Sequence, residues 1–478
     1  MGQVKIIKKK SEDISGWYND VVEKAQLVEH GPVKGTMIWR PRGYSLWEEI
    51  QKNLDLKIKN LGAKNVYFPL FIPESFLNKE KNHVKGFSPE LAVVTHAGGE
   101  KLTEPIVVRP TSETIMYDAF SRWIQSWRDL PLIINQWANV VRWEKRPYYF
   151  LRTTEFLWQE GHTAHKTNKE AQEMADNALK MYIEFYQNVL GLYGYAGKKS
   201  ESEKFPGADL TLTYEILMPD GKVVQGCTSH NLGQNFAKVF NVKFQDETGQ
   251  QQMVYQTSWG LSTRSIGAMI LMHGDDNGLV LPPMIAPIQV VIIPIVTKDT
   301  DGSNINNIAT KVFETLESSD IRVKLDDSDQ SPGWKFNQYE LEGVPIRIEI
   351  GATEAQSRKI RIVRRDNKVS MDISLDKLGA EIEKLLKDMQ GDLLHRSKKL
   401  TQENTKQADT YDEFKEIMKT NRGFIEAFWC ENPKCEEKIK EETKASTRCL
   451  PLDAIEARGK CIYCGKEAKS RWIFAQSY

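Results

Sequence analysis

A cluster of prolines marks a boundary inside this chain and limits what either side of it can form. Pro282, Pro283 and Pro287 interrupt the most apolar run of the sequence, residues 279–296. Proline has no backbone N–H and breaks both helices and strand ladders, so this run should not form a membrane-spanning helix. The prolines are instead typical of a linker. We therefore expect one domain before the linker, further domains after it, and no membrane association.

Length and charge narrow the possible functions further. A chain of 478 residues is long enough for about three domains. Its 65 Lys and Arg residues balance its 65 Asp and Glu residues, so any contact with nucleic acid should come from local patches. Residues 1–13 carry no apolar signal segment behind their positive charges. We therefore expect a cytoplasmic protein.

The part before the linker is expected to be one large domain on an antiparallel sheet. Apolar residues recur with helical spacing over residues 47–61, which predicts an amphipathic helix. Strand-like runs at 132–141 and 150–158 are joined by a short polar loop, which predicts an antiparallel hairpin. A capping box at Thr167 predicts the start of the next helix. A further strand is predicted at 210–217.

The part after the linker should hold two smaller units. Strand-like runs at 290–293, 321–325 and 344–350 alternate with helical patterns, which is typical of a compact α/β domain. From about residue 392 onward, a last segment carries most of the cysteines. The predicted fold class is therefore α/β, with a large α+β domain on an antiparallel sheet first in the chain.

The predicted hairpin would gather charged and aromatic side chains on one sheet face. Arg142 and Glu144 are two residues apart on one strand and should face the same side. Arg152 and Phe156 are four apart on the returning strand. Guanidinium groups can bind phosphate oxygens and an aromatic ring can stack on a base, so this face could bind a nucleotide. A cross-strand ion pair on a solvated face is the alternative.

Two other segments carry candidate binding groups. Arg264 precedes an apolar helical run, where its charge opposes the helix dipole unless an anion offsets it; a structural arginine is the alternative. The tripeptide 111–113 follows Pro110, which suits a binding loop, but it also suits a helix N-cap. Single histidines are more typical of structural roles than of ligands, and this interpretation covers His162, His165 and His230.

Four of the six cysteines have the spacing C-x4-C-x25-C-x2-C, formed by Cys430, Cys435, Cys461 and Cys464. Two close pairs make a tetrahedral thiolate site for structural Zn²⁺ possible. The clustering favours a metal site in a reducing compartment over a disulfide framework. Unliganded thiols, or Cys449 as a substitute ligand, are the alternatives.

Taken together, these segments resemble class II aminoacyl-tRNA synthetases, and specifically the prolyl-tRNA synthetases of the archaeal and eukaryotic type. Residues 43–73, 140–156 and 260–283 are similar to the class motifs 1, 2 and 3. VRPTSET at 108–114 matches the proline-binding loop of the family, and SPGWKFNQYELEGVPIRIEIG at 331–351 matches its anticodon-binding domain. The stretch between motifs 2 and 3 is too short for the editing domain inserted in the bacterial type.

The resemblance implies ATP-dependent activation of L-proline to prolyl-adenylate and transfer of the prolyl group to the 3′ end of tRNA(Pro). It implies a catalytic role for Arg142 at the α-phosphate and proline carboxylate, and for Arg264 at the γ-phosphate. The implied ATP-binding residues are Arg142, Glu144, Arg152, Phe156, Gln225, Thr228, Ser262 and Arg264. The implied proline-binding residues are Thr111, Glu113, Arg142, Trp158, Phe205 and His230. The implied metal ligands are Cys430, Cys435, Cys461 and Cys464.

The resemblance also implies a domain plan and partners. It implies a catalytic domain over 1–285, an anticodon-binding domain over 286–391 and a zinc-binding domain over 392–478. Mg²⁺ would accompany ATP, and the protein would be a cytoplasmic homodimer. The alternatives are another synthetase of the class, a zinc-dependent nucleic-acid-binding module, or a catalytically silent paralogue that binds RNA or regulates another enzyme. Such paralogues tend to lose the ATP arginines, whereas Arg142 and Arg264 are both present.

Overall fold

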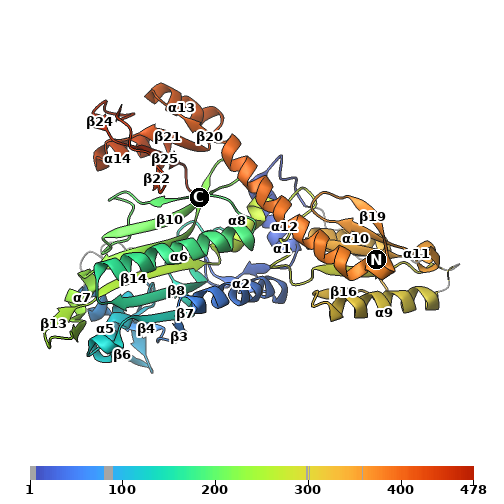
Figure 1. The fold of residues 1–478 in the computed structure, drawn as a ribbon, viewed down its shortest axis with the longest axis horizontal. Helices are drawn as coiled ribbons and strands as arrows, with labels where there is room; N and C mark the ends of the chain where they lie inside the picture. The colour runs from blue at the N-terminus through green and yellow to red at the C-terminus, as the bar shows by residue number, and fades with distance from the viewer. Residues whose placement is uncertain (1–6, 80–89, 298–299, 301, 358) are drawn as a thin grey trace.

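A sheet of eleven strands runs through the part of the chain that the structure describes (Figure 1). The computed structural model describes residues 7–79, 90–297, 300, 302–357 and 359–478. In order across the sheet, the strands are β20 (Thr405–Gln407), β21 (Phe424–Phe428), β25 (Arg471–Ala475), β22 (Ser446–Pro451), β9 (Tyr195–Lys198), β10 (Leu210–Leu217), β11 (Val223–Gly233), β14 (Tyr255–Ser262), β8 (Glu155–His165), β7 (Leu132–Val141) and β3 (Lys64–Asn65). Neighbouring strands are antiparallel, except that β20 pairs with β21 and β3 with β7 in parallel.

Two long helices cover this sheet, and both were predicted. The helix expected at 47–61 is α2 (Pro41–Asn60), whose buried side chains include Trp47 and Ile50. The helix expected after Thr167 is α6 (Asn168–Asn188), and the Thr167 hydroxyl accepts a hydrogen bond from its third backbone N–H at 3.2 Å. Helix α6 packs on β10, β11 and β14, and α2 packs on α6. The apolar periodicity therefore placed both helices correctly.

The predicted hairpin is present, but its connection is longer than expected. Strands β7 and β8 pair antiparallel up to Val141 and Glu155. The expectation that Arg142 and Glu144 lie on one strand, and Arg152 on the other, is wrong. Residues 142–154 leave the sheet because Pro147 cannot donate to a ladder and because the chain turns sharply at Phe150, whose φ is 59°. The returning strand begins at Glu155 instead of residue 150.

Shorter elements surround the first half of the sheet. Strands β4, β6 and β5 form a separate three-stranded sheet in that order. The elements are α1 (Ile14–Lys24), β1 (Val28–His30), β2 (Met37–Trp39), β4 (Phe71–Pro73), α3 (Glu74–Lys79), β5 (Val93–Ala97), β6 (Glu100–Val108), α5 (Glu113–Trp123), α7 (Asn235–Phe240), β12 (Lys243–Gln245), β13 (Gln251–Met253) and α8 (Arg264–His273).

The expected α/β unit follows the proline cluster. Its elements are β15 (Val290–Pro294), α9 (Gly302–Ser318), β16 (Val323–Leu325), α10 (Pro332–Leu341), β17 (Ile346–Ile350), α11 (Ala352–Ser357), β18 (Lys359–Arg364) and β19 (Ser370–Ser374). The sheet order is β16-β15-β17-β18-β19, with β15 parallel to both β16 and β17. The Arg365 guanidinium donates to both carboxylate oxygens of Asp275 at 2.7 and 2.5 Å, which ties this unit to the first part of the chain.

One long helix joins the α/β unit to the C-terminal elements. Helix α12 (Leu378–Glu403) runs diagonally from the α/β unit to the last strands (Figure 1). The elements after it, besides the strands already named, are α13 (Tyr411–Thr420), α14 (Pro433–Thr443), β23 (Gly459–Lys460) and β24 (Glu467–Ala468). Among the described residues, none of the helices has both the length and the apolar character needed to cross a membrane.

The C-terminal elements are continuous with the large sheet. Strand β22 pairs antiparallel with β9 through Leu450 with Lys198 and Pro451 with Gly197. A side chain at Gly197 would place its Cβ 2.3 Å from the Leu450 carbonyl oxygen. This close approach therefore requires glycine, and backbone pairing joins strands that lie far apart in the sequence.

A buried cluster of charges reinforces this junction. The Glu215 carboxylate of β10 is fully buried between Lys199, at 2.7 Å, and Arg448 of β22, at 2.7 Å. Burial would raise the pKa of Glu215, but the two cations outweigh it and hold the pKa at about 2. The carboxylate is therefore charged at neutral pH, and it binds one cation from each side of the junction.

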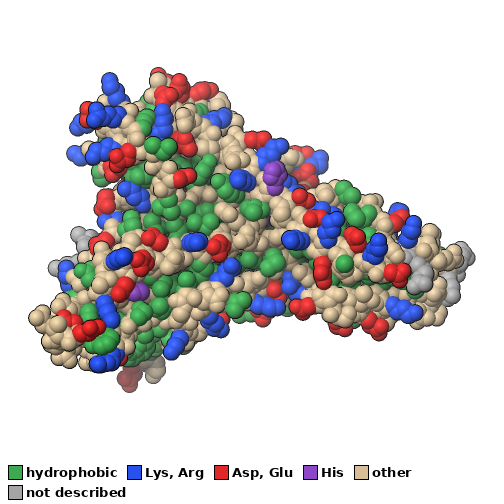
Figure 2. All heavy atoms as spheres, in the orientation of Figure 1, with side chains coloured by type: hydrophobic (Ala, Val, Ile, Leu, Met, Phe, Trp, Pro, Cys, Tyr) green, Lys and Arg blue, Asp and Glu red, His purple; other side chains and the backbone are tan. Residues whose placement is uncertain are grey.

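The surface agrees with the balanced charge of the sequence. Figure 2 shows Lys and Arg side chains interspersed with Asp and Glu over the visible face, along the α/β unit as well as the large sheet. A protein that bound polyanions over its whole surface would show one sign there.

We predict that Arg448→Met destabilises the protein by about 3–5 kcal/mol, because it leaves the buried Glu215 with one cation fewer. Urea unfolding followed by fluorescence measures the change. Arg458 is exposed, so Arg458→Met serves as the matched control and should change stability by less than about 0.5 kcal/mol. Equal effects of the two substitutions would contradict this account of the junction.

Candidate active site and metal site

A cavity of about 250 Å³ opens on one face of the large sheet. Its floor comes from β8, β11 and β14, and its rim from the start of α5, the start of α8 and the loop before β10. Of the residues predicted to bind ATP or proline, the cavity is lined by Thr111, Glu113, Arg142, Phe156, Trp158, Phe205, Gln225, Thr228, His230, Ser262 and Arg264. The structure thus gathers residues from six separate segments in one place.

Glu144 and Arg152, the other two residues predicted for the ATP site, are not in the cavity wall. Both lie on the connection between β7 and β8. The Glu144 carboxylate accepts a hydrogen bond from the backbone N–H of Arg146 at 2.7 Å. Arg152 forms a backbone bridge with Tyr148. Whether either contacts a nucleotide stays a prediction.

A buried arginine fixes the segment that carries Thr111 and Glu113. Arg109 is fully buried at the end of β6 and donates to the carbonyls of Phe68 and Asn139, each at 2.8 Å. These bonds tie the segment to β7 and to the chain before β4. The Thr111 hydroxyl then donates to the Glu113 carboxylate. The hydrogen bonds of Arg109 therefore fix the backbone at this part of the cavity rim.

The tripeptide 111–113 lies both at the start of a helix and at the cavity, and whether it binds a ligand stays a prediction. Ser112 occupies the N-cap position of α5, but its side chain makes no capping hydrogen bond. Its hydroxyl instead donates to the Glu160 carboxylate at 2.5 Å. The segment begins a helix and also presents polar groups to the cavity.

Arg142 lines the cavity, and a carbonyl oxygen and two aromatic rings lie next to its guanidinium. Its Nε donates to the Pro110 carbonyl oxygen at 3.0 Å. Its guanidinium carbon lies 5.7 Å from the ring centre of Phe156 and 5.4 Å from that of Trp158. Burial lowers the pKa of Arg142, and the Glu113 charge partly offsets this. The group stays protonated, so it can neutralise an anion in the cavity.

Arg264 also lines the cavity, as the first residue of α8. Its Nε donates to the Leu151 carbonyl oxygen at 3.1 Å. Burial lowers its pKa without removing the charge. Arg264 is at the N-terminus of α8, where the helix dipole is positive. An anion bound at this terminus would be stabilised by both the dipole and the guanidinium.

An aromatic pair forms a third wall. The rings of Phe205 and His230 stack with centres 4.5 Å apart and planes at 27°. Thr211 holds both residues: its hydroxyl accepts from the Phe205 N–H at 3.0 Å and lies 2.9 Å from His230 Nδ1. Burial lowers the pKa of His230 to about 4. The imidazole is therefore neutral at pH 7 and adds no positive charge to the cavity.

Sequence reasoning did not assign two residues of the cavity to the site: Glu160 was not singled out, and His162 was interpreted as a structural histidine. Glu160 and His162 line the cavity, and Glu160 Oε2 lies 3.0 Å from His162 Nε2. Burial disfavours the charged imidazole of His162, but Glu160 and Glu113 outweigh this and raise its pKa. The signal was the strand alternation from Phe156 through Trp158, which continues to 160 and 162 once β8 is extended. The predicted strand ended too early to include them.

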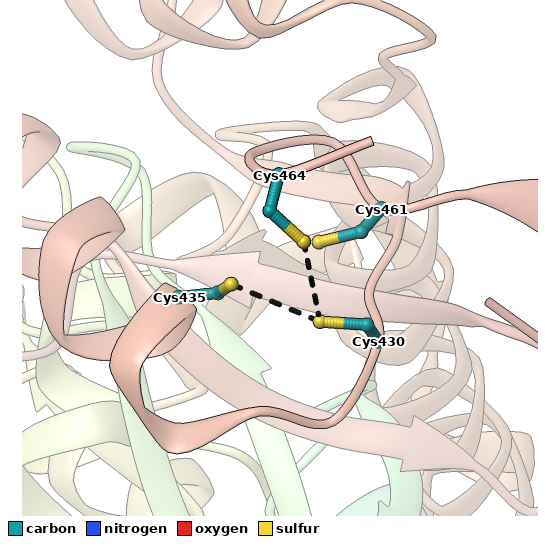
Figure 3. Close-up of side chains that lie close together, drawn as sticks. All are labelled: Cys430, Cys435, Cys461 and Cys464. Atoms are coloured by element: carbon teal, nitrogen blue, oxygen red, sulfur yellow. Dashed lines mark hydrogen bonds between the residues drawn. The ribbon is translucent and has the colours of Figure 1, made fainter. Parts of the chain in front are cut away.

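The four cysteines predicted as metal ligands lie close together within the C-terminal elements (Figure 3). Cys430 follows β21, Cys435 lies in α14, and Cys461 and Cys464 follow β23. The Cys430 sulfur is 3.8 Å from that of Cys435 and 3.7 Å from that of Cys464, and all four sulfurs lie within 4.8 Å of one another. A tetrahedron with Zn–S bonds of about 2.3 Å has edges of about 3.8 Å. The four thiols thus fit a tetrahedral metal ion.

The thiols differ in protonation, because burial and the neighbouring thiols raise the pKa values of Cys430 and Cys435. Burial would raise the pKa of Cys464, but the Lys466 N–H and the neighbouring thiols lower it to about 7. A thiolate present near neutral pH can take up a cation without a large cost in deprotonation. Cys449 lies in β22 outside this group, so the alternative in which it replaces a ligand has no geometric support.

Comparisons with known proteins cover the whole chain. The sequence model of the class II tRNA synthetase core domain (G, H, P, S and T) matches residues 98–273. The models of the anticodon binding domain and of the prolyl-tRNA synthetase C-terminal region match residues 289–385 and 411–478.

Relatives that match nearly the whole chain are named proline–tRNA ligases. The chain is 48% identical to a proline–tRNA ligase 2 of Bacillus cereus, covering 100% of this chain and 99% of that one. It is 50% identical to proline–tRNA ligase of Ruminiclostridium cellulolyticum, covering 98% and 97%. A crystal structure of prolyl-tRNA synthetase from Cryptosporidium parvum with L-proline and AMP has a TM-score of 0.94 at 44% identity, covering 100% of this chain and 98% of that one. The same enzyme with halofuginone and AMPPNP has a TM-score of 0.95 at 46% identity, covering 99% and 100%.

We predict that His230 contributes to the acid sensitivity of the fold. Its pKa falls from 6.5 to about 4 on folding, so its contribution to stability is complete above pH 6.5 and is lost as pH falls toward 4. The loss amounts to about 3 kcal/mol at most. His230→Gln should therefore flatten the fall in melting temperature between pH 6.5 and 4. His96 is exposed, and His96→Gln should leave the profile unchanged. An unaltered profile for His230→Gln would contradict the neutral state of this imidazole.

Proposed function

Because the chain belongs to the prolyl-tRNA synthetases, the class II enzymes that attach proline to tRNA, we propose that its cavity binds ATP and L-proline side by side. The observation that carries this proposal is that two arginines, Arg142 and Arg264, line one cavity together with carboxylates and aromatic rings. The Cryptosporidium parvum relative binds L-proline and AMP in one crystal and AMPPNP in another, which supports the same pair of ligands here.

The proline side lies near Glu113 and the aromatic walls. Trp158 and Phe205 offer apolar surfaces to a rigid ring. The secondary ammonium of proline would be bound by the Glu113 carboxylate, with the Thr111 hydroxyl beside it. Neutral His230 does not repel that ammonium. Arg142 would bind the proline carboxylate.

The nucleotide side lies toward Arg264. Phe156 would stack on the adenine, and the polar side chains of Gln225, Thr228 and Ser262 would contact the nucleotide. Arg264 would hold the γ-phosphate at the N-terminus of α8. Glu144 and Arg152 would reach the nucleotide from the connection between β7 and β8, and Mg²⁺ would arrive with the phosphates of ATP.

The first step is a displacement at phosphorus. A carboxylate oxygen of proline attacks the α-phosphorus of ATP, a new P–O bond forms, and pyrophosphate leaves with the electrons of the broken bond. Arg142 would contact both the attacking carboxylate and the α-phosphate, so it would align the two and stabilise the charge that develops. Arg264 would stabilise the leaving pyrophosphate.

The second step needs no protein nucleophile. A hydroxyl of the 3′-terminal ribose of tRNA(Pro) attacks the carbonyl carbon of prolyl-adenylate, and AMP leaves. Cys227 lines the cavity, but burial raises the pKa of its thiol, so it remains protonated and takes no part.

The remaining parts of the chain would serve tRNA binding and assembly. We assign the catalytic domain to 1–285, the anticodon-binding domain to 286–391 and the zinc-binding domain to 392–478; the family models match residues 98–273, 289–385 and 411–478, inside these ranges. We also propose that the protein is cytoplasmic, because its cysteines are free thiols of the kind that a reducing compartment maintains.

The homodimer expected from motif 1 has support in exposed apolar side chains. Tyr67 is 71% exposed, Phe71 50%, Leu56 65% and Trp123 48%. The first three lie on the motif 1 helix or on the segment that follows it. Large apolar groups in contact with water favour burial against a second copy of the chain.

Pyrophosphate exchange with each of the twenty amino acids, without tRNA, tests the central proposal. Proline should drive the exchange, and Arg142→Ala and Arg264→Ala should each reduce its rate by about 10²-fold, since each removes charge stabilisation from the phosphoryl step. The exposed Arg128 lies outside the cavity, so Arg128→Ala should be neutral. Exchange driven by another amino acid would overturn the proline assignment. Exchange unaffected by both arginine substitutions would overturn the nucleotide assignment.

Zinc content tests the metal proposal. The four thiols should bind one Zn²⁺ per chain, measured by inductively coupled plasma mass spectrometry after dialysis. Cys461→Ala should lower the content because it removes one of four ligands. The buried Cys449 lies outside the group, and Cys449→Ala should retain the metal. Equal zinc content in all three proteins would refute the ligand assignment.

A further inference from the structure

One wall of the proline side comes from a loop that is held by the C-terminal elements. Residues 199–209 connect β9 to β10, and residues 203–206 of this loop line the cavity. Phe205 stacks on His230 from this loop. The position of the Phe205 ring therefore depends on what fixes the loop.

A buried carboxylate from outside the cavity contacts the loop, in addition to the bonds that Lys199 makes to Glu215 and Phe205 makes to Thr211. Glu436 of α14 is only 4% exposed. Its oxygens accept hydrogen bonds from the hydroxyls of Ser200, at 3.3 Å, and of Ser202. The hydroxyl of Thr447 in β22 also donates to it. A buried carboxylate needs such donors to offset its lost hydration, so these bonds should hold firmly.

Ser200 transmits this contact to the cavity. Its side chain binds Glu436, while its carbonyl oxygen accepts from the backbone N–H groups of Glu203 at 3.1 Å and Lys204 at 2.9 Å. These bonds form the turn that leads directly to Phe205. Glu436 thus fixes the first residue of the turn, and the turn fixes the aromatic wall.

The nucleotide side is built differently. Phe156 and Ser262 lie in β8 and β14, and Arg264 begins α8, all within the large sheet or directly after it. The contacts of Glu436 named above are with the loop and with β22. A change at Glu436 should therefore move the proline wall and leave the nucleotide wall in place.

We propose that Glu436 is a positioning residue for proline: it holds the 199–209 loop so that Phe205 closes the proline side of the cavity. The proposal rests on the proposed function, in which Phe205 and His230 border the proline ring. It assigns to α14, a helix that contains the metal ligand Cys435, an indirect part in amino-acid recognition.

Exchange kinetics on the full-length, zinc-loaded protein test the proposal. Glu436→Ala and Ser200→Ala remove the contact from opposite sides, and Ser200, which passes the contact on to the turn, is distant from the cysteines in sequence. Each should raise the KM for proline roughly fivefold or more, because small misplacements of a binding wall have large effects. The KM for ATP should change less than about twofold. Glu437, exposed on the same helix, provides the control Glu437→Ala, which should leave both constants unchanged.

Three further measurements separate the outcomes. Zinc content and melting temperature show whether Glu436→Ala has disturbed the metal site, and if it has, Ser200→Ala decides alone. Phe205→Ala tests the pocket assignment itself. If Phe205→Ala raises the KM for proline while Ser200→Ala and a zinc-loaded Glu436→Ala do not, the positioning role is refuted. If Phe205→Ala also has no effect, the proposed pocket is wrong. Parallel rises in both KM values would likewise refute the selective role of Glu436.

Discussion

The backbone pairing of β22 with β9 is the contact on which the rest of the arrangement depends. It makes the cysteine-bearing elements and the cavity-bearing strands parts of one sheet. The buried Glu215 cluster lies at this junction, and so does the carboxylate of Glu436. Because strand pairing fixes register as well as position, side chains separated by more than 200 positions in the sequence can meet with hydrogen-bond precision.

The charge of the cavity depends on how backbone carbonyls orient its two arginines. Arg142 and Arg264 each donate Nε to a backbone carbonyl. A carbonyl orients a guanidinium without cancelling its charge, which preserves attraction for phosphate and carboxylate groups. The neutral state of His230 belongs to the same pattern, since burial removes a positive charge from the side where an ammonium would bind.

Sequence reasoning located the elements with strong periodicity, and the family resemblance supplied eleven of the residues that line the cavity. Helices α2 and α6 followed from apolar spacing and a capping box, and the cysteine group followed from spacing alone. Local patterns could not reveal that residues 142–154 leave the sheet, because a proline and a left-handed residue act there together. Glu160 and His162 were not assigned to the site because their role depends on where β8 ends. Glu436 had no local signal, since its partners lie on β22 and on a loop far away in the chain.

The length of helix α12 fixes the distance between two parts of the molecule. Its 26 residues span about 39 Å as a continuous helix. One end packs on α9 and β19 of the α/β unit, and the other contacts β20 at the edge of the large sheet. The helix therefore sets a fixed distance between the α/β unit and the edge of the large sheet. A single inserted residue would rotate everything beyond it by about 100° and advance it by about 1.5 Å, so the spacing between the two ends can change only in coarse steps.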